Sequence, residues 1–136
     1  MQTMVTIGEL APYSPEGVQA YHNNEIKHFD LYNDFKGKWQ VLVFYPGDFT
    51  FVCPTELKEL ADHDSEFQQL GAAVLCVSTD SVYVHKAWHD ESPAIKSMTI
   101  PMIADPTGNL CRAFGVYLEH EGVALRGSFI IDPDGI

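Results

Sequence analysis

One cysteine of this sequence, Cys53, stands directly before Pro54, where an apolar run gives way to a helical pattern. Proline suits the first helical position because its missing N–H would have no intrahelical partner there. The unpaired N–H groups and the positive dipole end of a helix N-terminus favour negative charge. A free cysteine is only about 3% thiolate at pH 7, and such surroundings lower its pKa to roughly 3.5–7.5. Cys53 is therefore a candidate nucleophile, and the alternative is a buried, inert thiol.

Four further residues could assist Cys53. Thr50 offers a hydroxyl close to the sulfur or merely caps a strand end, and Pro46 either shapes the site or ends the strand. Glu56 could complete a capping arrangement, but its charge would oppose a thiolate unless a cation neutralised it. Arg126 is the cation that we expect in this role.

Two other chemistries fit the sequence less well. A thioredoxin-like thiol–disulfide oxidoreductase needs a second cysteine where Glu56 stands. His85 and His89 have the helical spacing of zinc ligands, but Lys86 replaces the glutamate of a His-Glu-x-x-His motif. Because no nearby residues complete four ligands, we expect solvated or packing histidines and no metal.

The elements that must position these residues alternate between strand and helix, which predicts one α/β domain with helices over a mostly parallel sheet. The expected strands cover 39–46 and 72–80, both buried, together with 100–105 and 126–131. The expected helices cover 54–70, ended by Gly71, then 81–91 and a short helix within 106–115. The turn-rich first forty residues carry one short strand, which leads into a loop within 22–31.

Composition limits the partners. The 136 residues carry a net charge of −11, which disfavours nucleic acid and anionic membrane surfaces. Apolar runs are too short for a membrane span, and the first residues lack the pattern of a signal peptide. With three cysteines, we expect a cytoplasmic protein whose thiols are catalytic or buried. The sequence ends just after a hairpin signal, Asp132–Gly135, so we expect a longer parent protein.

The segment "YPGDFTFVCPTEL" resembles the active-site motif of the peroxiredoxins, Pro-x-x-x-Thr/Ser-x-x-Cys, at Pro46, Thr50 and Cys53. The segment "GVALRGSFIIDPDGI" is similar to the arginine-bearing strand of that family, with Arg126 in the arginine's place. The resemblance runs from about Ile7 to the end and is strongest to the bacterial alkyl hydroperoxide reductase C subunits, which are typical two-cysteine peroxiredoxins. It implies a thioredoxin-like fold with a central mixed sheet flanked by helices.

The resemblance also implies roles. Cys53 would be the peroxidatic cysteine, which attacks hydrogen peroxide or an alkyl hydroperoxide and becomes a sulfenic acid. Thr50 and Arg126 would hold the peroxide oxygens, Pro46 would shield the sulfur from water, and Glu56 would orient Arg126. No metal or organic cofactor is implied. The expected partners are a thioredoxin-like or flavoprotein reductase and a second copy of the chain, with rings of five dimers and a chaperone-like scaffold role left open.

The sequence departs from that family in its second thiol. A typical two-cysteine enzyme carries the resolving cysteine in a C-terminal segment that this sequence lacks, so we expect no resolving cysteine in this chain. Cys76 lies inside an apolar strand and is expected in the core. Cys111, in the predicted short helix, could be partly exposed, and a resolving role for it is the less favoured alternative because the two sulfurs would have to meet.

Overall fold

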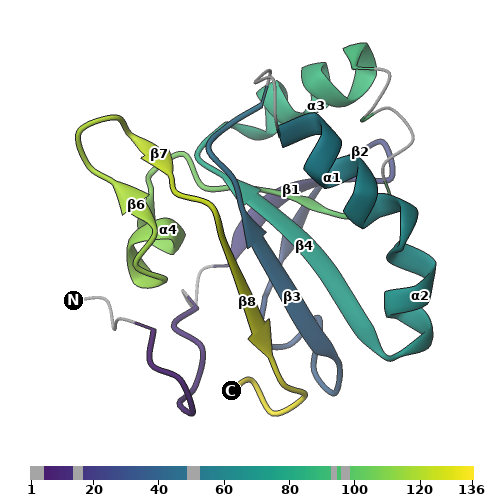
Figure 1. The fold of residues 1–136 in the computed structure, drawn as a ribbon, viewed down its shortest axis with the longest axis vertical. Coiled ribbons are helices and arrows are strands. Elements are labelled where there is room, and N and C mark those ends of the chain that lie inside the picture. The colour runs from purple at the N-terminus through teal and green to yellow at the C-terminus, as the bar shows by residue number, and fades with distance from the viewer. Residues whose placement is uncertain (1–4, 14–16, 49–52, 93–94, 96–98) are drawn as a thin grey trace.

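The computed structural model describes residues 5–13, 17–48, 53–92, 95 and 99–136. Within these ranges, six strands form one sheet in the order β2-β1-β5-β4-β3-β8, and β6 and β7 form a separate hairpin (Figure 1). The strands are β1 (Val18–His22), β2 (Glu25–Phe29), β3 (Trp39–Phe44), β4 (Ala72–Ser78), β5 (Met102–Ala104), β6 (Tyr117–Leu118), β7 (Val123–Ala124) and β8 (Gly127–Ile131). The helices are α1 (Cys53–Asp62), α2 (Asp64–Gln69), α3 (Val82–Glu91) and α4 (Asn109–Ala113).

The sheet is mixed. Strands β3, β4 and β5 run parallel in its centre. Antiparallel strands flank them, with β8 beside β3 and the β1–β2 hairpin beside β5. The alternation of strands and helices correctly predicted the parallel centre, but the expectation of a mostly parallel sheet was wrong because it left out the pairing of β1, β2 and β8.

The β1–β2 hairpin depends on two asparagines. Asn23 and Asn24 adopt positive φ angles of 52° and 64° between the strands. Two consecutive left-handed residues match the twist of a tight hairpin, and asparagine tolerates this conformation better than most residues. The sequence pattern predicted a strand near β2 but missed β1, since "VQAYH" shows no strict alternation of apolar and polar residues.

Apolar side chains cover both faces of the sheet. One face carries Leu42, Phe44, Leu75 and Val77, which pack with α4 and the N-terminal segment. The other face packs against α1, α2 and α3 (Figure 1). Its buried members are Tyr21, Tyr45, Leu57, Val74, Cys76, Trp88, Ile95, Ile100 and Met102. The period of two along β3 and β4 therefore divides the core into two layers.

Two expected elements differ from the structure. The single helix predicted over 54–70 is broken at His63, which separates α1 from α2. Asp64 is buried beyond the break and accepts hydrogen bonds from Gln68 and Thr99, an anchor that turns the chain out of the first helix axis. Strand β3, which was expected to be buried, is only half-buried on one face, and its first residue, Trp39, is 45% exposed.

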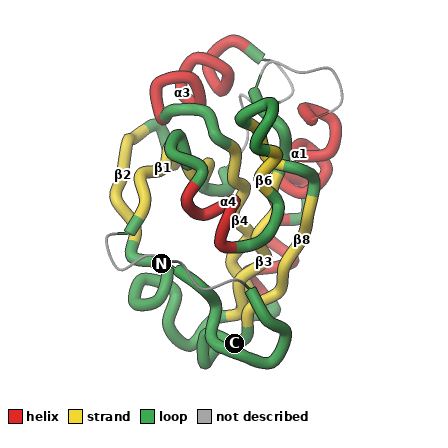
Figure 2. Tube along the Cα trace, turned by 90° about the vertical axis from the view of Figure 1, so that its left-hand side faces the viewer, coloured by secondary structure: helices red, strands yellow, loops and turns green. Residues whose placement is uncertain are grey.

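The segment around Ala11 contacts the C-terminal turn at one end of the sheet, where loops gather (Figure 2). The N–H of Ala11 donates to the carbonyl of Gly135 over 2.7 Å. At the turn predicted by "DPDG", the Asp132 carboxylate accepts from the N–H groups of Asp134 and Ile136. Among the described residues, no helix has the length and apolar character needed to cross a bilayer.

Candidate active site

Cys53 is the first residue of α1, which begins one residue before the start expected at Pro54. The helix begins after the connection that leaves β3 at Phe44, of which Tyr45–Asp48 are described. The ten-residue helix directs its N-terminus toward this end of the sheet (Figure 1). Because the first N–H groups of a helix have no intrahelical partner, this end favours an anionic group.

The strand register brings the main chain of Arg126 to the same edge of the sheet. Gly127, the first residue of β8, pairs with Phe44, the last residue of β3. Arg126 therefore lies directly before the first pair of the β3–β8 ladder, at the end of β3 from which the chain continues toward Cys53. Arg126 is exposed, and it lies in the connection between β7 and β8 rather than inside the strand.

The structure describes the remaining predicted residues to different extents. Pro46 is half-buried in the connection after β3. Thr50 lies outside the described residues. Glu56 is a residue of α1, but its side chain is not among the described parts of the chain. The structure thus brings Pro46, Cys53 and Arg126 to one edge at the level of the main chain.

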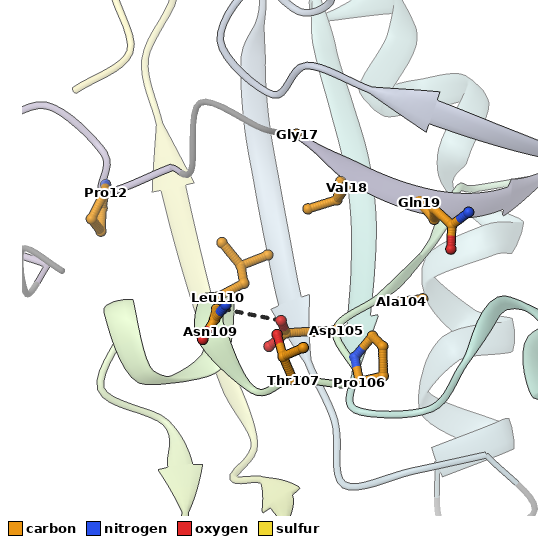
Figure 3. A pocket seen from close by; sticks show the side chains of 10 residues that line it. All are labelled: Pro12, Gly17, Val18, Gln19, Ala104, Asp105, Pro106, Thr107, Asn109 and Leu110. Carbon is orange, nitrogen blue, oxygen red and sulfur yellow. Dashed lines mark hydrogen bonds between the residues drawn. The ribbon is translucent and has the colours of Figure 1, made fainter. Parts of the chain in front are cut away.

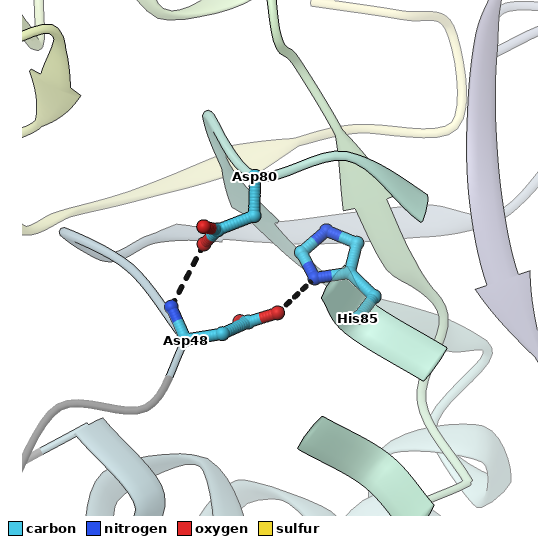
Figure 4. A group of neighbouring side chains, drawn as sticks. All are labelled: Asp48, Asp80 and His85. Atoms are coloured by element: carbon cyan, nitrogen blue, oxygen red, sulfur yellow. Dashed lines mark hydrogen bonds and ion pairs between the residues drawn. The ribbon is translucent and has the colours of Figure 1, made fainter. Parts of the chain in front are cut away.

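A buried polar cluster that sequence reasoning did not predict adjoins this edge (Figure 4). Asp48 accepts a hydrogen bond from the Tyr45 hydroxyl at 2.6 Å, and its other oxygen lies 2.6 Å from Nδ1 of His85. The Asp48 N–H donates to Asp80 at 2.8 Å, and the Ser78 hydroxyl donates to the same Asp80 oxygen at 2.7 Å. The cluster joins the chain leaving β3 to β4 and α3.

The histidines considered as zinc ligands serve packing and hydrogen bonding. His85 has no exposed surface and uses Nε2 toward the Ile103 carbonyl at 3.0 Å. His89 is buried and packs edge-on against Tyr21, with ring centroids 5.2 Å apart. Ligand atoms of Asp48, Asp80 and His85 lie within 4.8 Å of one another. Both Asp48 oxygens and both His85 nitrogens already take part in hydrogen bonds, so the donor set fits an internal network better than a cation.

The two other cysteines are removed from the surface. Cys76 and Cys111 are free thiols with 0% exposure. Burial raises the pKa of the Cys76 thiol well above its usual value, and the Asp48 carboxylate acts in the same direction. Burial, followed by a hydrogen bond to Asp105, also raises the pKa of the Cys111 thiol. The expected core position of Cys76 is confirmed, and the partial exposure considered for Cys111 was wrong because α4 turns it inward.

A pocket beside α4 has polar groups in its wall, but they already serve the fold (Figure 3). Asp105 lies there between β5 and α4 and is buried. Its carboxylate accepts from the N–H groups of Leu110 and Cys111 at 3.1 and 2.8 Å. These bonds cap α4 in place of Gly108, whose position at the helix N-terminus supplies no side chain. Asp105 therefore holds the helix that covers one face of the sheet.

Comparison with solved structures first defines the class of fold. The AhpC of Enterococcus faecalis superposes with a TM-score of 0.84 at 47% identity, covering 87% of this chain and 70% of that one. The reduced 2-Cys peroxiredoxin of Plasmodium vivax superposes with a TM-score of 0.90 at 31% identity, covering 97% and 82%. The chain thus has the peroxiredoxin variant of the thioredoxin-like fold, with its central mixed sheet flanked by helices.

Sequence comparison then gives the family. Residues 11–136 match the profile of the AhpC/TSA family, and the chain belongs to that family. Alkyl hydroperoxide reductase C of Pseudomonas aeruginosa is 47% identical over 123 residues, which make up 90% of this chain. The chain spans 65% of the length of that relative, just under two thirds. The resemblance carried by the motif around Cys53 is confirmed at the level of family and fold.

Proposed function

We propose that this protein is a thiol-dependent peroxidase that reduces hydrogen peroxide and alkyl hydroperoxides, with Cys53 as its nucleophile. The observation that carries the proposal is the meeting of two chain segments at one edge of the sheet. Cys53 opens α1 there, and the pairing of Gly127 with Phe44 brings the main chain of Arg126 to the same level. Membership in the AhpC/TSA family supports the same reading.

The proposed step is a displacement at oxygen. The Cys53 thiolate forms an S–O bond with one peroxide oxygen as the O–O bond breaks, and the other oxygen leaves as alkoxide or hydroxide. A proton then converts the leaving group to alcohol or water, so the sulfur is oxidised to sulfenic acid and the peroxide is reduced. Arg126 and the Thr50 hydroxyl stabilise the negative charge that grows on the departing oxygen. Pro46 limits access of water, and Glu56 orients Arg126.

The thiolate state alone does not supply the rate. Lowering a thiol's pKa increases its thiolate fraction but reduces the nucleophilicity of that thiolate. The position of Cys53 at a helix N-terminus accounts for the first effect. The cation and the hydroxyl must therefore align the peroxide with the sulfur, a contribution that depends on geometry.

Return to the thiol requires an electron donor. Cys76 and Cys111 are buried, which argues against either as the resolving thiol. The proposed reductant is a thioredoxin-like protein or a flavoprotein reductase, which supplies two electrons and releases water from the sulfenic acid. Two free thiols inside the fold are compatible with the reducing cytoplasm. Dimers, and rings of dimers, belong to this proposal as well.

Mass spectrometry after one equivalent of peroxide, with dimedone present, tests the proposal. We expect one dimedone adduct, confined to the peptide that contains Cys53. The Cys53→Ser variant is expected to give no adduct and no peroxide consumption, while Cys111→Ser behaves like the unmodified protein. Adducts distributed equally over the three cysteines, or peroxide consumption that survives Cys53→Ser, would contradict it.

A further inference from the structure

The chain that leaves β3 is fastened to the rest of the fold through Asp48 (Figure 4). The Asp48 side chain has no exposed surface, and neither has that of His85. One carboxylate oxygen accepts from Tyr45 and the other lies 2.6 Å from Nδ1 of His85, while the Asp48 N–H donates to Asp80. Tyr45 directly follows β3, His85 belongs to α3, and Asp80 lies in the short connection between β4 and α3. Asp48 is thus a fixed point just before the residues that lead to Cys53.

The hydrogen bonds of His85 determine how many protons the pair holds. The Ile103 carbonyl can only accept, so Nε2 of His85, 3.0 Å away, must carry a hydrogen. Nδ1 and the Asp48 oxygen, 2.6 Å apart, would place two lone pairs face to face unless one proton lies between them. The pair therefore holds two protons, either as imidazolium with carboxylate or as imidazole with carboxylic acid. Both forms have no net charge.

The surrounding groups favour retention of the shared proton. Burial raises the pKa of Asp48, and the nearby Asp80 carboxylate acts in the same direction, although His85 and Tyr45 oppose it. Burial also raises the pKa values of Tyr45 and Cys76 well above their usual values, which keeps the hydroxyl and the thiol neutral. Asp80 itself accepts from the Ser78 hydroxyl and the Asp48 N–H.

We propose that Asp48 and His85 are a positioning pair for the peroxidase site, an inference that rests on the proposed function of Cys53. The pair ties the chain at Asp48, which leads on toward Cys53, to α3 and β5, and the pair itself carries no net charge. An unpaired carboxylate at this place would be costly to bury. The shared proton avoids that cost.

If Asp48 and His85 share a proton, three substitutions should affect their hydrogen-bond network differently. In Asp48→Asn, the amide N–H replaces the shared proton toward Nδ1 and the amide oxygen still accepts from Tyr45, so the network and its neutrality persist. Asp48→Ala removes the anchor. His85→Phe fills the space of the ring but leaves the Asp48 carboxylate buried without its partner. Asp64→Ala is the matched control, since Asp64 is a buried carboxylate on α2 bonded to Gln68 and Thr99.

The test is the rate of Cys53 alkylation by iodoacetamide from pH 4 to 9, followed by peptide mass spectrometry on the full chain. Since displacements near 1 Å can cost about 10²-fold, we expect Asp48→Ala and His85→Phe to change the pH-independent rate at least ~10-fold. Asp48→Asn is expected to stay within ~3-fold of the unmodified protein, with the same apparent thiolate pKa, because its geometry and charge are conserved. We expect Asp64→Ala to lower stability without altering this profile.

Two outcomes would overturn the inference: an Asn variant as impaired as the Ala variant, or Ala and Phe variants with unchanged profiles. A measurement on the unmodified protein needs no variant to fold. Long-range 1H–15N NMR at pH 7 should show His85 protonated at Nε2, as imidazole or imidazolium, and a ring protonated at Nδ1 alone would refute the proton count.

The alkylation profile is independent of peroxide turnover. If these results hold while Cys53 does not react with peroxide, the proposed function fails and the pairing stands as an anchor for the segment before Cys53. If Cys53 reduces peroxide but the alkylation profiles of Asp48→Ala, Asp48→Asn and His85→Phe all match that of the unmodified protein, the proposed function stands and the positioning role fails.

Discussion

Gly127 of β8 lies opposite Phe44 of β3, and this pairing fixes the level at which Arg126 meets the chain that leads to Cys53. The two segments are far apart in sequence, and their meeting depends on β8 running antiparallel to β3 at the edge of the sheet. Gly127 has little room for a side chain, because a Cβ would come within 3.2 Å of Val116 and 3.4 Å of Phe129. Close packing around Gly127 therefore fixes the position of the main chain from which the Arg126 side chain extends.

Arg126→Ala is expected to slow sulfenic acid formation by about 10²-fold or more, as the loss of one group that stabilises a developing oxyanion typically does. Stopped-flow mixing with peroxide, read by tryptophan fluorescence or by quenched mass spectrometry, measures the rate. Arg112→Ala is the matched control, since Arg112 is the chain's other arginine, bonded to Glu119 at 2.9 Å and placed over the Tyr117 ring. Equal effects of the two substitutions would argue against a role for Arg126 in the reaction.

The three cysteines should differ in their reaction with a thiol reagent in the folded protein. Cys76 and Cys111 have 0% exposure, and burial raises both thiol pKa values, so few thiolates form there at neutral pH. Labelling with N-ethylmaleimide at pH 7, followed by peptide mapping, is expected to modify Cys53 first and the other two only on denaturation. Rapid labelling of Cys111 in the native state would contradict its burial and reopen a resolving role.

Local signals predicted the parts of this molecule that depend on neighbouring residues. Pro54 after Cys53 marked the start of α1, and the helix expected over 81–91 corresponds to α3, which Ser81 caps by accepting from the Val84 N–H. The break at His63 was not predictable in the same way, because it depends on the contact of Asp64 with the distant Thr99.

The polar cluster shows the same limit at the site. Asp48 and His85 are 37 positions apart, and only the stacking of α3 beside the connection after β3 brings them together. His85 was expected as a solvated or packing histidine, and its four-residue spacing from His89 drew attention to zinc rather than to a carboxylate partner. A charged residue in an apolar context within "FYPGDF" was the available signal, but it did not identify the partner.

Asp105→Ala is expected to lower the free energy of unfolding by about 1–2 kcal/mol, the usual cost of losing a helix cap. The Asp105 carboxylate accepts from two N–H groups of the first turn of α4, and these would be left unsatisfied in a buried place. Urea denaturation followed by circular dichroism gives the value. Glu121→Ala, at an exposed acidic residue, serves as the control and should change stability little. An unchanged midpoint for Asp105→Ala would show that α4 does not depend on this cap.

His22 should make the stability of the protein depend on pH between neutral and mildly acidic conditions. Burial is the main cause that lowers the pKa of His22 below 6.5, with the nearby Lys27 acting in the same direction. Because the unfolded chain then binds a proton more readily than the folded one, the stability contribution is present above pH 6.5 and is lost as pH falls through the folded pKa. The His22 Nδ1 atom is buried without a hydrogen-bond partner, which agrees with a neutral ring.

His22→Phe keeps a flat ring at this position and removes the titration. We expect the free energy of unfolding of the unmodified protein, measured in urea at several pH values from 8 to 5, to fall relative to that of the variant as pH decreases. The comparison of two proteins cancels the contributions of the other histidines, whose surroundings are the same in both. A difference that stays constant over this range, or that moves in favour of the unmodified protein at pH 5, would show that His22 is not the neutral group that its burial predicts.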